Sequence, residues 1–305
     1  MTPALLGNLC AIGALLMFSV NIIVTKLAAA KTSLRLGFLV AVTLNVLVCL
    51  LLFGVELALR DTRLQWDGPA FWMFVLSGVF ATYLGRWFFF ESVVRLGPAK
   101  ASVYQISSPF FTALIAWALF GQALSRPELA GAAVVVCGLL LVANIRPPPR
   151  PAGNDAAGGP KPSSGAMIGV GGAIAYSIAF LLRGAAITRW NEPVLGTLLG
   201  ACSGTVLHLL TSPDTRHLGR HLRQANRHGV LLFGASGVLT ILAQICMIVS
   251  LRYIPVSIAS LISLSTPALV FPMSYFLLKN EEGISLAPVL GCALTFAGVA
   301  LILMY

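Results

Sequence analysis

Apolar and polar residues alternate along this chain in long blocks. Ten stretches are almost wholly apolar, and shorter polar segments separate them. A helix that crosses a bilayer needs about 20 consecutive apolar residues, and each stretch comes close to that length. The pattern therefore predicts an all-α integral membrane protein. Its ten transmembrane helices are expected near residues 4–25, 34–55, 70–94, 98–121, 127–145, 165–186, 193–211, 229–251, 255–278 and 284–304.

One polar break differs in composition from the others and divides the chain into two parts. Residues 146–164 are rich in Pro, Gly and Ala and have no apolar periodicity, which is typical of a linker. We therefore predict a first five-helix repeat at 1–146, a linker loop at 147–164 and a second five-helix repeat at 165–305.

The two parts repeat the same pattern of prolines and glycines. A proline opens the fourth helix, another lies near its middle, and two glycines lie on the fifth helix; all four return 157 to 160 residues later. Such self-similarity indicates two structurally equivalent halves. Because five helices is an odd number, the second half is expected to be inverted relative to the first. The matched positions are Pro98 and Pro255, Pro109 and Pro267, Gly131 and Gly291, and Gly138 and Gly298.

Composition supports a membrane protein and excludes several other classes. Of the 305 residues, 58% are hydrophobic and 10% are charged, whereas soluble domains carry about 25% charged residues. The net charge of +10 comes mainly from short loops, where Lys and Arg set membrane orientation. We therefore expect a lipid bilayer, and not nucleic acid, as a partner. The six cysteines lie inside apolar stretches without metal-ligand spacing, so no metal and no cofactor is expected.

Several short motifs carry a resemblance to a known family. They are Phe18, Ser19 and Asn21 in the first helix, the mid-helix prolines Pro109 and Pro267, and the turn-then-glycine patterns Gln122…Gly131…Gly138 and Glu282…Gly291…Gly298. The chain resembles the ten-helix drug/metabolite transporter superfamily, specifically the EamA-type permeases. It departs from that family in having Phe18 where Trp is usual and Gln122 where Glu is usual. The resemblance implies secondary transport or facilitated efflux of small metabolites, commonly amino acids and related compounds.

Arg86 is the most informative polar residue inside an apolar stretch. It lies roughly eight residues before the predicted end of the third helix, and a central arginine costs at least about 2.5 kcal/mol on insertion scales. Glu91 is better placed to pair with Arg95, four residues on, than with Arg86. We therefore hypothesise that Arg86 binds the carboxylate or phosphate of an anionic or zwitterionic substrate. The alternatives are snorkelling to the interface and a structural bond between helices.

Other polar side chains are expected around a cavity between the halves, near the midplane. Tyr83 precedes Arg86 by three residues and should share its side of the helix. Hydroxyl groups precede both mid-helix prolines, where they either line the cavity or bond the carbonyl that proline frees. No catalytic residue is expected. The candidate substrate-binding residues are Arg86, Tyr83, Asn21, Tyr104, Gln105, Ser108, Tyr176, Gln244, Ser263 and Thr266.

These features favour a carrier that exports a small organic metabolite across a cell membrane, specifically a bacterial inner membrane, by alternating access. A non-transporting membrane subunit or receptor stays open as an alternative. A lipid-modifying membrane enzyme is a third, but it needs clustered Asp, Glu or His. The paired glycines allow close helix approach, so the fifth and tenth helices are expected to pack on each other or on a second protomer in a homodimer.

Two criteria disagree about the orientation of the chain. Thirteen Lys and Arg residues follow the odd-numbered helices and six follow the even-numbered ones. The positive-inside rule then puts both termini outside the cytoplasm. The family resemblance implies that both termini are inside, and we follow the resemblance.

Overall fold

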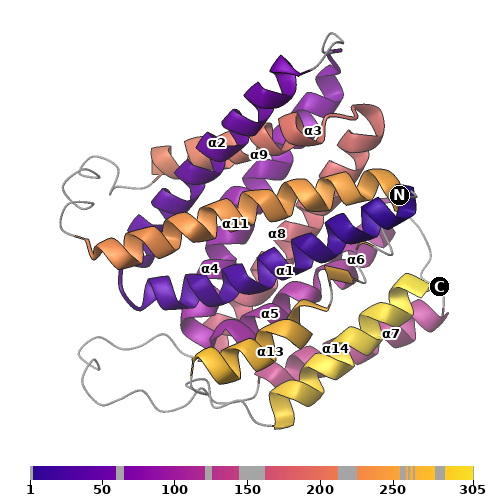
Figure 1. Cartoon of the computed structure of the whole chain (residues 1–305). Coiled ribbons are helices and arrows are strands. Elements are labelled where there is room, and N and C mark those ends of the chain that lie inside the picture. Colours follow the sequence, from indigo (N-terminus) through magenta and orange to yellow (C-terminus); the bar gives the residue numbers. More distant parts are fainter. Residues whose placement is uncertain are drawn as a thin grey trace.

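The computed structural model is built of helices and short connections, with no strand among the residues it describes (Figure 1). Residues 147–161 of the predicted linker at 147–164, and the predicted turns at Gln122 and Glu282, lie outside the residues that it describes. The structure describes residues 3–59, 65–120, 126–143, 162–211, 225–254, 259, 262–263, 265–278 and 286–304.

The helices follow the predicted apolar stretches in both halves. The first half contains α1 (Pro3–Ala29), α2 (Leu34–Ala58), α3 (Gly68–Gly78), the π-helical η1 (Val79–Gly85), α4 (Arg86–Leu96), α5 (Pro98–Ile106), α6 (Ser108–Phe120) and α7 (Arg126–Ala143). The second half contains α8 (Pro162–Arg189), α9 (Pro193–Thr211), α11 (Arg227–Tyr253), α13 (Thr266–Leu277) and α14 (Leu286–Met304). Helix α8 begins three residues before the predicted second repeat.

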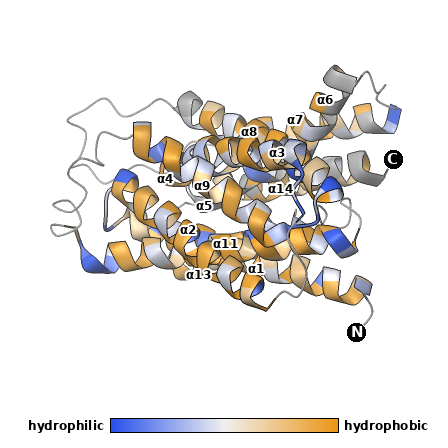
Figure 2. Ribbon diagram, turned by 90° about the horizontal axis from the view of Figure 1, so that it is seen from above, coloured by the Kyte–Doolittle hydropathy of each residue, from blue (hydrophilic) through white to orange (hydrophobic). Residues whose placement is uncertain are grey.

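Six helical runs in the described part of the chain are long and apolar enough to cross a membrane: α1, α2, the continuous run α3–η1–α4, α8, α9 and α11. Their outer faces carry large apolar side chains, such as Leu51, Leu210 and Leu231. Figure 2 shows hydrophobic residues along most of each helix. A continuous apolar surface of this kind suits lipid contact. The prediction of an all-helical membrane fold is confirmed, and the count of ten spans stays a prediction.

The predicted helix at 98–121, with its mid-helix proline, is two helices in the structure. The chain breaks at Ser107, between α5 and α6. The cause is Pro109, which has no N–H to donate and whose ring clashes with the preceding turn, so that it fits best in the first turn of the new helix α6. The Ser107 hydroxyl donates to the Tyr104 carbonyl at 2.6 Å, so this hydroxyl compensates part of the broken hydrogen-bond ladder.

Each helix of the first half packs against a helix of the second half, and the pairs are equivalent under the repeat. Helix α1 lies along α11, and α8 lies along α3, η1 and α4. Helix α2 packs on α9, and α7 packs on α14. Figure 1 shows α1 beside α11 and α7 beside α14. Because α1 corresponds to α8 and the α3–α4 run corresponds to α11, each half offers the other an equivalent partner.

Contacts between aromatic rings and glycines form a reciprocal pair across the halves. The Phe74 ring leaves no room for a Cβ at Gly196, and the Phe233 ring leaves none at Gly37. Phe233 and Gly196 lie 159 residues after Phe74 and Gly37 respectively. A two-fold axis produces this isologous pattern, in which residue i contacts residue j and the reverse.

Two further reciprocal contacts involve the backbone. Gly78 lies against the Gly200 carbonyl, and Gly237, 159 residues after Gly78, lies against the Ala41 carbonyl. In each case a side chain would displace backbone atoms of the neighbouring helix. These positions therefore fix how closely α3 approaches α9 and how closely α11 approaches α2.

The glycine faces of α7 and α14 pack on each other. Gly138 lies against Gly291 and Thr295, and Gly298 lies against Gly131 and Val135. The second contact repeats the first after 160 residues. The predicted packing of these two helices on each other is therefore present within the chain. The homodimer stays a prediction, and it would have to use other faces of these helices.

Equivalent side chains also cap α3 and α11. The Asp67 carboxylate accepts a hydrogen bond from the Ala70 N–H at 2.8 Å. Asn226, 159 residues later, accepts from the His228 N–H at 2.9 Å. The Ala70 hydrogen bond lowers the pKa of the Asp67 carboxyl, and Arg189, 3.4 Å away, lowers it further. The Arg189 contact joins the end of α8 to the start of α3.

Candidate functional site

A row of polar side chains runs along α11 inside the bundle. Ser236, Thr240 and Gln244 are spaced by four residues, so they share one face of the helix. Ser236 and Thr240 are buried, and Gln244 is partly buried. Each of the three bonds a different neighbouring helix, and α11 therefore connects the polar groups of the interior.

Arg86 contacts the middle of this row. Its side chain is only 3% exposed, and Nη2 donates to the Thr240 hydroxyl at 3.1 Å. With its amide oxygen turned toward the arginine, Asn45 of α2 accepts from Nη1, an orientation assigned from the surrounding donors and acceptors. The guanidinium also lies 5.2 Å from the centre of the Phe90 ring, within the range of a cation–π contact. Arg86 thus has one hydrogen-bond partner in its own half and one in the other half.

Arg183 is the interior arginine that the second half contributes. It lies six residues before the end of α8, and its Nη2 donates to Gln244 Oε1 at 3.1 Å. Its Nε donates to the Ser77 hydroxyl of α3 at 3.4 Å. Arg183 therefore also has one partner in its own half and one in the other half.

Ser236, the remaining residue of the row, joins α11 to α1 through neutral groups. The Ser236 hydroxyl donates to Asn21 Oδ1 at 2.6 Å. The Thr25 hydroxyl lies 3.1 Å from the same Ser236 oxygen. All three side chains are buried, and their mutual hydrogen bonds offset the loss of water around them.

Tyr176 of α8 connects the two arginines to a small cavity. The tyrosine lies within electrostatic reach of both Arg86 and Arg183, and its ring packs against Gly85. The cavity lies between α4, α5 and α8, and its volume of about 10 Å³ suits roughly one water molecule. Its lining residues are Phe89, Ser92, Ala101, Gln105, Gly169, Gly172, Ala173 and Tyr176.

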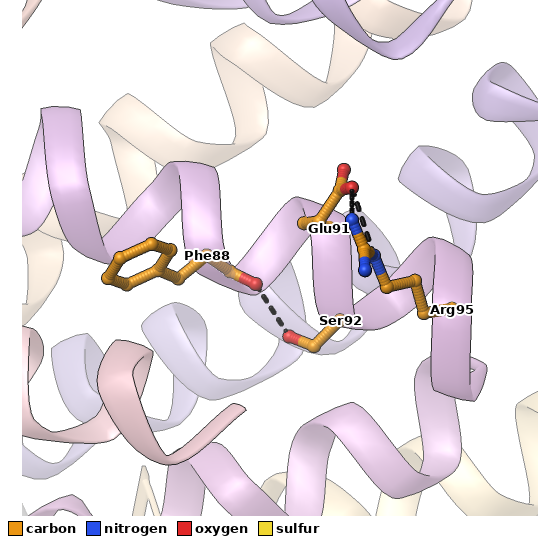
Figure 3. A network of polar contacts seen from close by, with 4 residues as sticks. All are labelled: Phe88, Glu91, Ser92 and Arg95. Carbon is orange, nitrogen blue, oxygen red and sulfur yellow. Dashed lines mark hydrogen bonds and ion pairs between the residues drawn. The ribbon is translucent and has the colours of Figure 1, made fainter. Parts of the chain in front are cut away.

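The carboxylate nearest to Arg86 along its helix is paired elsewhere. Arg95 Nε donates to Glu91 Oε1 at 3.0 Å, which confirms the predicted pair (Figure 3). Ser92 points away from that pair, and its hydroxyl donates to the Phe88 carbonyl at 2.8 Å (Figure 3). Glu91 is therefore engaged by Arg95 four residues along the helix, while Arg86 bonds neutral groups.

The comparison with protein families decides what kind of protein carries this site. The model of the EamA-like transporter family matches residues 5–144 and again residues 163–304. The chain belongs to the EamA-like transporter family. Because that match covers both repeats, this EamA-like chain is a multi-pass membrane protein with a two-repeat architecture, as the sequence motifs indicated.

Solved structures support the same fold. One of them, titled only "Crystal structure of protein", aligns over 97% of this EamA-like chain and 96% of its own length, with a TM-score of 0.60 and 18% sequence identity. At that identity the likeness concerns the fold alone. Among curated proteins, the comparison found no match.

The structure brings five of the ten candidate residues to one region of this EamA-like fold. Arg86, Gln244 and Asn21 contact the polar row of α11. Gln105 and Tyr176 line the adjacent cavity. The alternative role of Arg86, a bond between helices, is present in the structure. Its Nε has no hydrogen-bond partner among the residues that the structure describes.

The other candidates lie in different surroundings. Tyr83 donates to the Thr211 hydroxyl at 2.9 Å and not into the arginine network. The reason is η1, because a π-helical turn changes the angle between residues three apart. Tyr104 is buried against Gly169 of α8, and its hydroxyl has no partner among the described residues.

The candidates next to the two prolines bond both their own helix and other helices. The Ser108 carbonyl accepts from Ser177 and Thr112, and Thr266 donates to the Ser263 carbonyl at 2.6 Å. The Ser263 hydroxyl donates to Met247 Sδ at 3.7 Å. The Thr266 bond fits the alternative role that the sequence left open, which is to compensate the interrupted helix.

Sequence reasoning missed several members of the site. Arg183 lies inside the predicted helix at 165–186 and inside α8, but it was counted among the six Lys and Arg residues of the even-numbered side and not as an interior charge. Its seven-residue spacing from Tyr176, two helical turns, was the available signal. Asn45 and Ser77 gave none, because single small polar residues in apolar helices more often bond their own backbone.

Proposed function

We propose that this protein is a carrier that exports a small organic metabolite, such as an amino acid or a related compound, from a bacterial cell across the inner membrane. It works as a secondary carrier or a facilitator, by alternating access between two inverted repeats of five spans. The observation that carries this proposal is the polar cluster on α11, in which side chains from both halves meet inside an apolar bundle.

The reciprocal contacts support the inverted arrangement. Phe74 with Gly196 and Phe233 with Gly37 are related by a constant shift, as a two-fold axis requires. If each half has five spans, that axis lies in the membrane plane, and the halves face opposite sides of the bilayer. Rocking one half against the other then exposes the region between them to one side at a time.

The polar cluster supports transport because it is difficult to explain by stability alone. Charged and amide side chains inside spanning helices are expensive unless they pair or line a passage. The cavity beside Tyr176 has room for roughly one water molecule. This cavity is too small for a metabolite, which would enter there only after α4 and α8 separate.

A flux experiment tests the proposal. Purified protein in liposomes is given a panel of radiolabelled amino acids, purine compounds and quaternary amines, and internal label is followed over time. We expect saturable flux of at least one compound, above that of protein-free liposomes. Absence of flux across the panel, with the protein shown to be folded by its thermal unfolding, would contradict the proposal and favour a non-transporting subunit or receptor.

The direction and orientation are tested separately. We propose that both termini lie in the cytoplasm, and reporter fusions at each terminus that are active only in the cytoplasm should therefore be active. Activity of an export-dependent reporter at both termini would reverse the orientation. Export is tested by loading cells with the transported compound and measuring its loss in cells with and without the protein.

A further inference from the structure

The two interior arginines come from opposite halves and lie at adjacent levels of α11. Arg86 bonds Thr240 and Arg183 bonds Gln244. These partners are four residues apart, which is about 6 Å along a helix. Two positive charges are thus placed about one helical turn apart along the helix that joins the polar groups, and Tyr176 lies near both.

The partners of both arginines are neutral. Arg86 bonds a hydroxyl and an amide, and Arg183 bonds an amide and a hydroxyl. Within the described residues, no carboxylate contributes to the electrostatic surroundings of either guanidinium. An uncompensated buried charge is strongly unfavourable, and arginine does not escape by deprotonation. A carrier that keeps two such charges gains if an anion supplies the opposite charge.

The distribution of partners between the halves shows how an anion would be accommodated. Each guanidinium has one partner in its own half, Asn45 for Arg86 and Gln244 for Arg183. Each also has one partner in the other half, Thr240 and Ser77 respectively. When the halves move apart, the contacts within a half persist and those between halves break. Each arginine then offers a free N–H, and in the described part of the chain the Arg86 Nε is without a partner already.

We propose that the cargo of this carrier is a small organic anion, whose carboxylate or phosphate oxygens are bound by Arg86 and Arg183 together. The cargo replaces the bonds from Arg86 to Thr240 and from Arg183 to Ser77 when the halves open. This inference rests on the proposed function and names the substrate class of the same site. Carboxylate and phosphate share the planar, bidentate recognition that arginine provides.

The first test compares compounds that differ mainly in charge. Currents or tracer fluxes are measured in proteoliposomes for succinate, benzoate and glycerol 3-phosphate, for the neutral compounds succinamide, benzamide and glycerol, and for tetramethylammonium. We expect flux of at least one anion and none of its neutral counterpart. The carboxylate and phosphate members of the panel distinguish the two anion chemistries.

The variants Arg86→Gln and Arg183→Gln connect the flux to the site. Each should reduce anion flux by about tenfold or more, because a hydrogen bond to a charged group is lost. Glu91→Gln is the matched control, since it removes a charge from the same span as Arg86 without touching the site, and it should leave the flux unchanged.

A third variant keeps the test valid if the arginine variants fail to fold. Gln244→Glu places a carboxylate of nearly the same size beside Arg183, so the protein should unfold at the same or a higher temperature. The internal carboxylate should then compete with cargo and reduce anion flux by about tenfold.

The outcomes separate the two proposals. A neutral or cationic cargo whose flux survives both arginine variants would overturn the anion site and leave the transport function in place. Anion flux that is unchanged in Arg86→Gln, Arg183→Gln and Gln244→Glu would also overturn it. Absence of flux for every compound, in this panel and in the metabolite panel above, would remove the transport proposal and the anion site with it.

Discussion

The two halves of the molecule agree in their packing and differ in their charge. The contacts of Phe74, Gly78 and Asp67 in the first half each have a counterpart 159 residues later. The polar side chains of the interior do not repeat in this way. At a shift of 158 residues, Arg86 corresponds to Gln244, and Thr25 corresponds to Arg183.

This difference separates what the fold needs from what the site needs. Close helix contacts depend on glycine and aromatic residues, and both halves must keep them because the halves pack on each other. At each pair of equivalent positions only one half carries the charge. Arg86 of α4 corresponds to an amide on α11, and Arg183 of α8 corresponds to a hydroxyl on α1. Each half thus supplies one arginine, on non-equivalent helices.

The largest effect is expected from filling the repeated glycine contacts. Gly78→Leu and Gly237→Leu each force a side chain into the backbone of a neighbouring helix. Overpacking costs about 1–3 kcal/mol and more where backbone must move, so both variants should lose most of their folded protein in detergent. Thermal unfolding and the yield of monodisperse protein measure this.

The matched controls for these variants are glycines in open surroundings. Gly54→Leu and Gly184→Leu meet no atom within 4 Å of the new Cβ, and both should fold. If one of the two repeated positions tolerates leucine as well as the controls do, the halves are not equivalent in packing.

A smaller effect is expected from hydroxyls in the polar row. Thr240→Val removes an acceptor from a buried arginine, which amounts to about 1.5–3 kcal/mol for a charged partner. Thr25→Val removes a hydroxyl that lies near a neutral serine, for which about 0.5–1.5 kcal/mol is expected. Unfolding temperatures should rank wild type, Thr25→Val and Thr240→Val in decreasing order. The reverse order would mean that the charge of Arg86 adds nothing to this bond.

The ion pair of α4 should matter less than either hydroxyl. Glu91 and Arg95 are four residues apart and partly exposed, with 22% and 27% of their side chains accessible. Pairs of this kind contribute about 0.3–0.5 kcal/mol. Glu91→Gln should therefore shift the unfolding temperature only slightly, and a loss comparable to that of Thr240→Val would show that the pair has another role.

The smallest effect concerns the two helix caps and depends on pH. The pKa of Asp67 is lowered in the folded protein, so its contribution to stability is present above the usual Asp value of about 3.9. That contribution is lost as the pH falls through the lowered native value. Asn226 caps α11 without a charge and adds no such dependence. Asp67→Asn should keep the cap and flatten the acid side of the stability profile, measured from unfolding temperatures; an unchanged profile would contradict this assignment.

Much of the fold followed from the sequence, because apolar length and repeated prolines and glycines are local signals. The family resemblance and the Glu91–Arg95 pair rest on such signals, and both are confirmed. The break at Ser107 was underestimated, since a proline inside a helix predicts a kink or a break equally well.

The site was less accessible from the sequence, because its contacts join helices far apart in the chain. Arg183 lies near the end of its apolar stretch, three residues before the predicted end at 186, and was therefore counted with the charges that flank the helices. Ser236 and Thr240 look like ordinary small residues until their neighbours on other helices are known. Tyr83 was assigned to the wrong neighbours because a regular helical angle was assumed across Val79–Gly85.

That wide turn, η1, has one more consequence. From Gly78 to Arg86 the first half has eight steps, whereas from Gly237 to Gln244 the second half has seven. Deleting one residue from Val79–Gly85 would restore regular winding and rotate α4 relative to α3 by about 100°. The Arg86 guanidinium would then no longer lie on the side of the helix that meets α11, although no residue that contacts it had been altered. A single additional residue thus determines the direction in which the charge points.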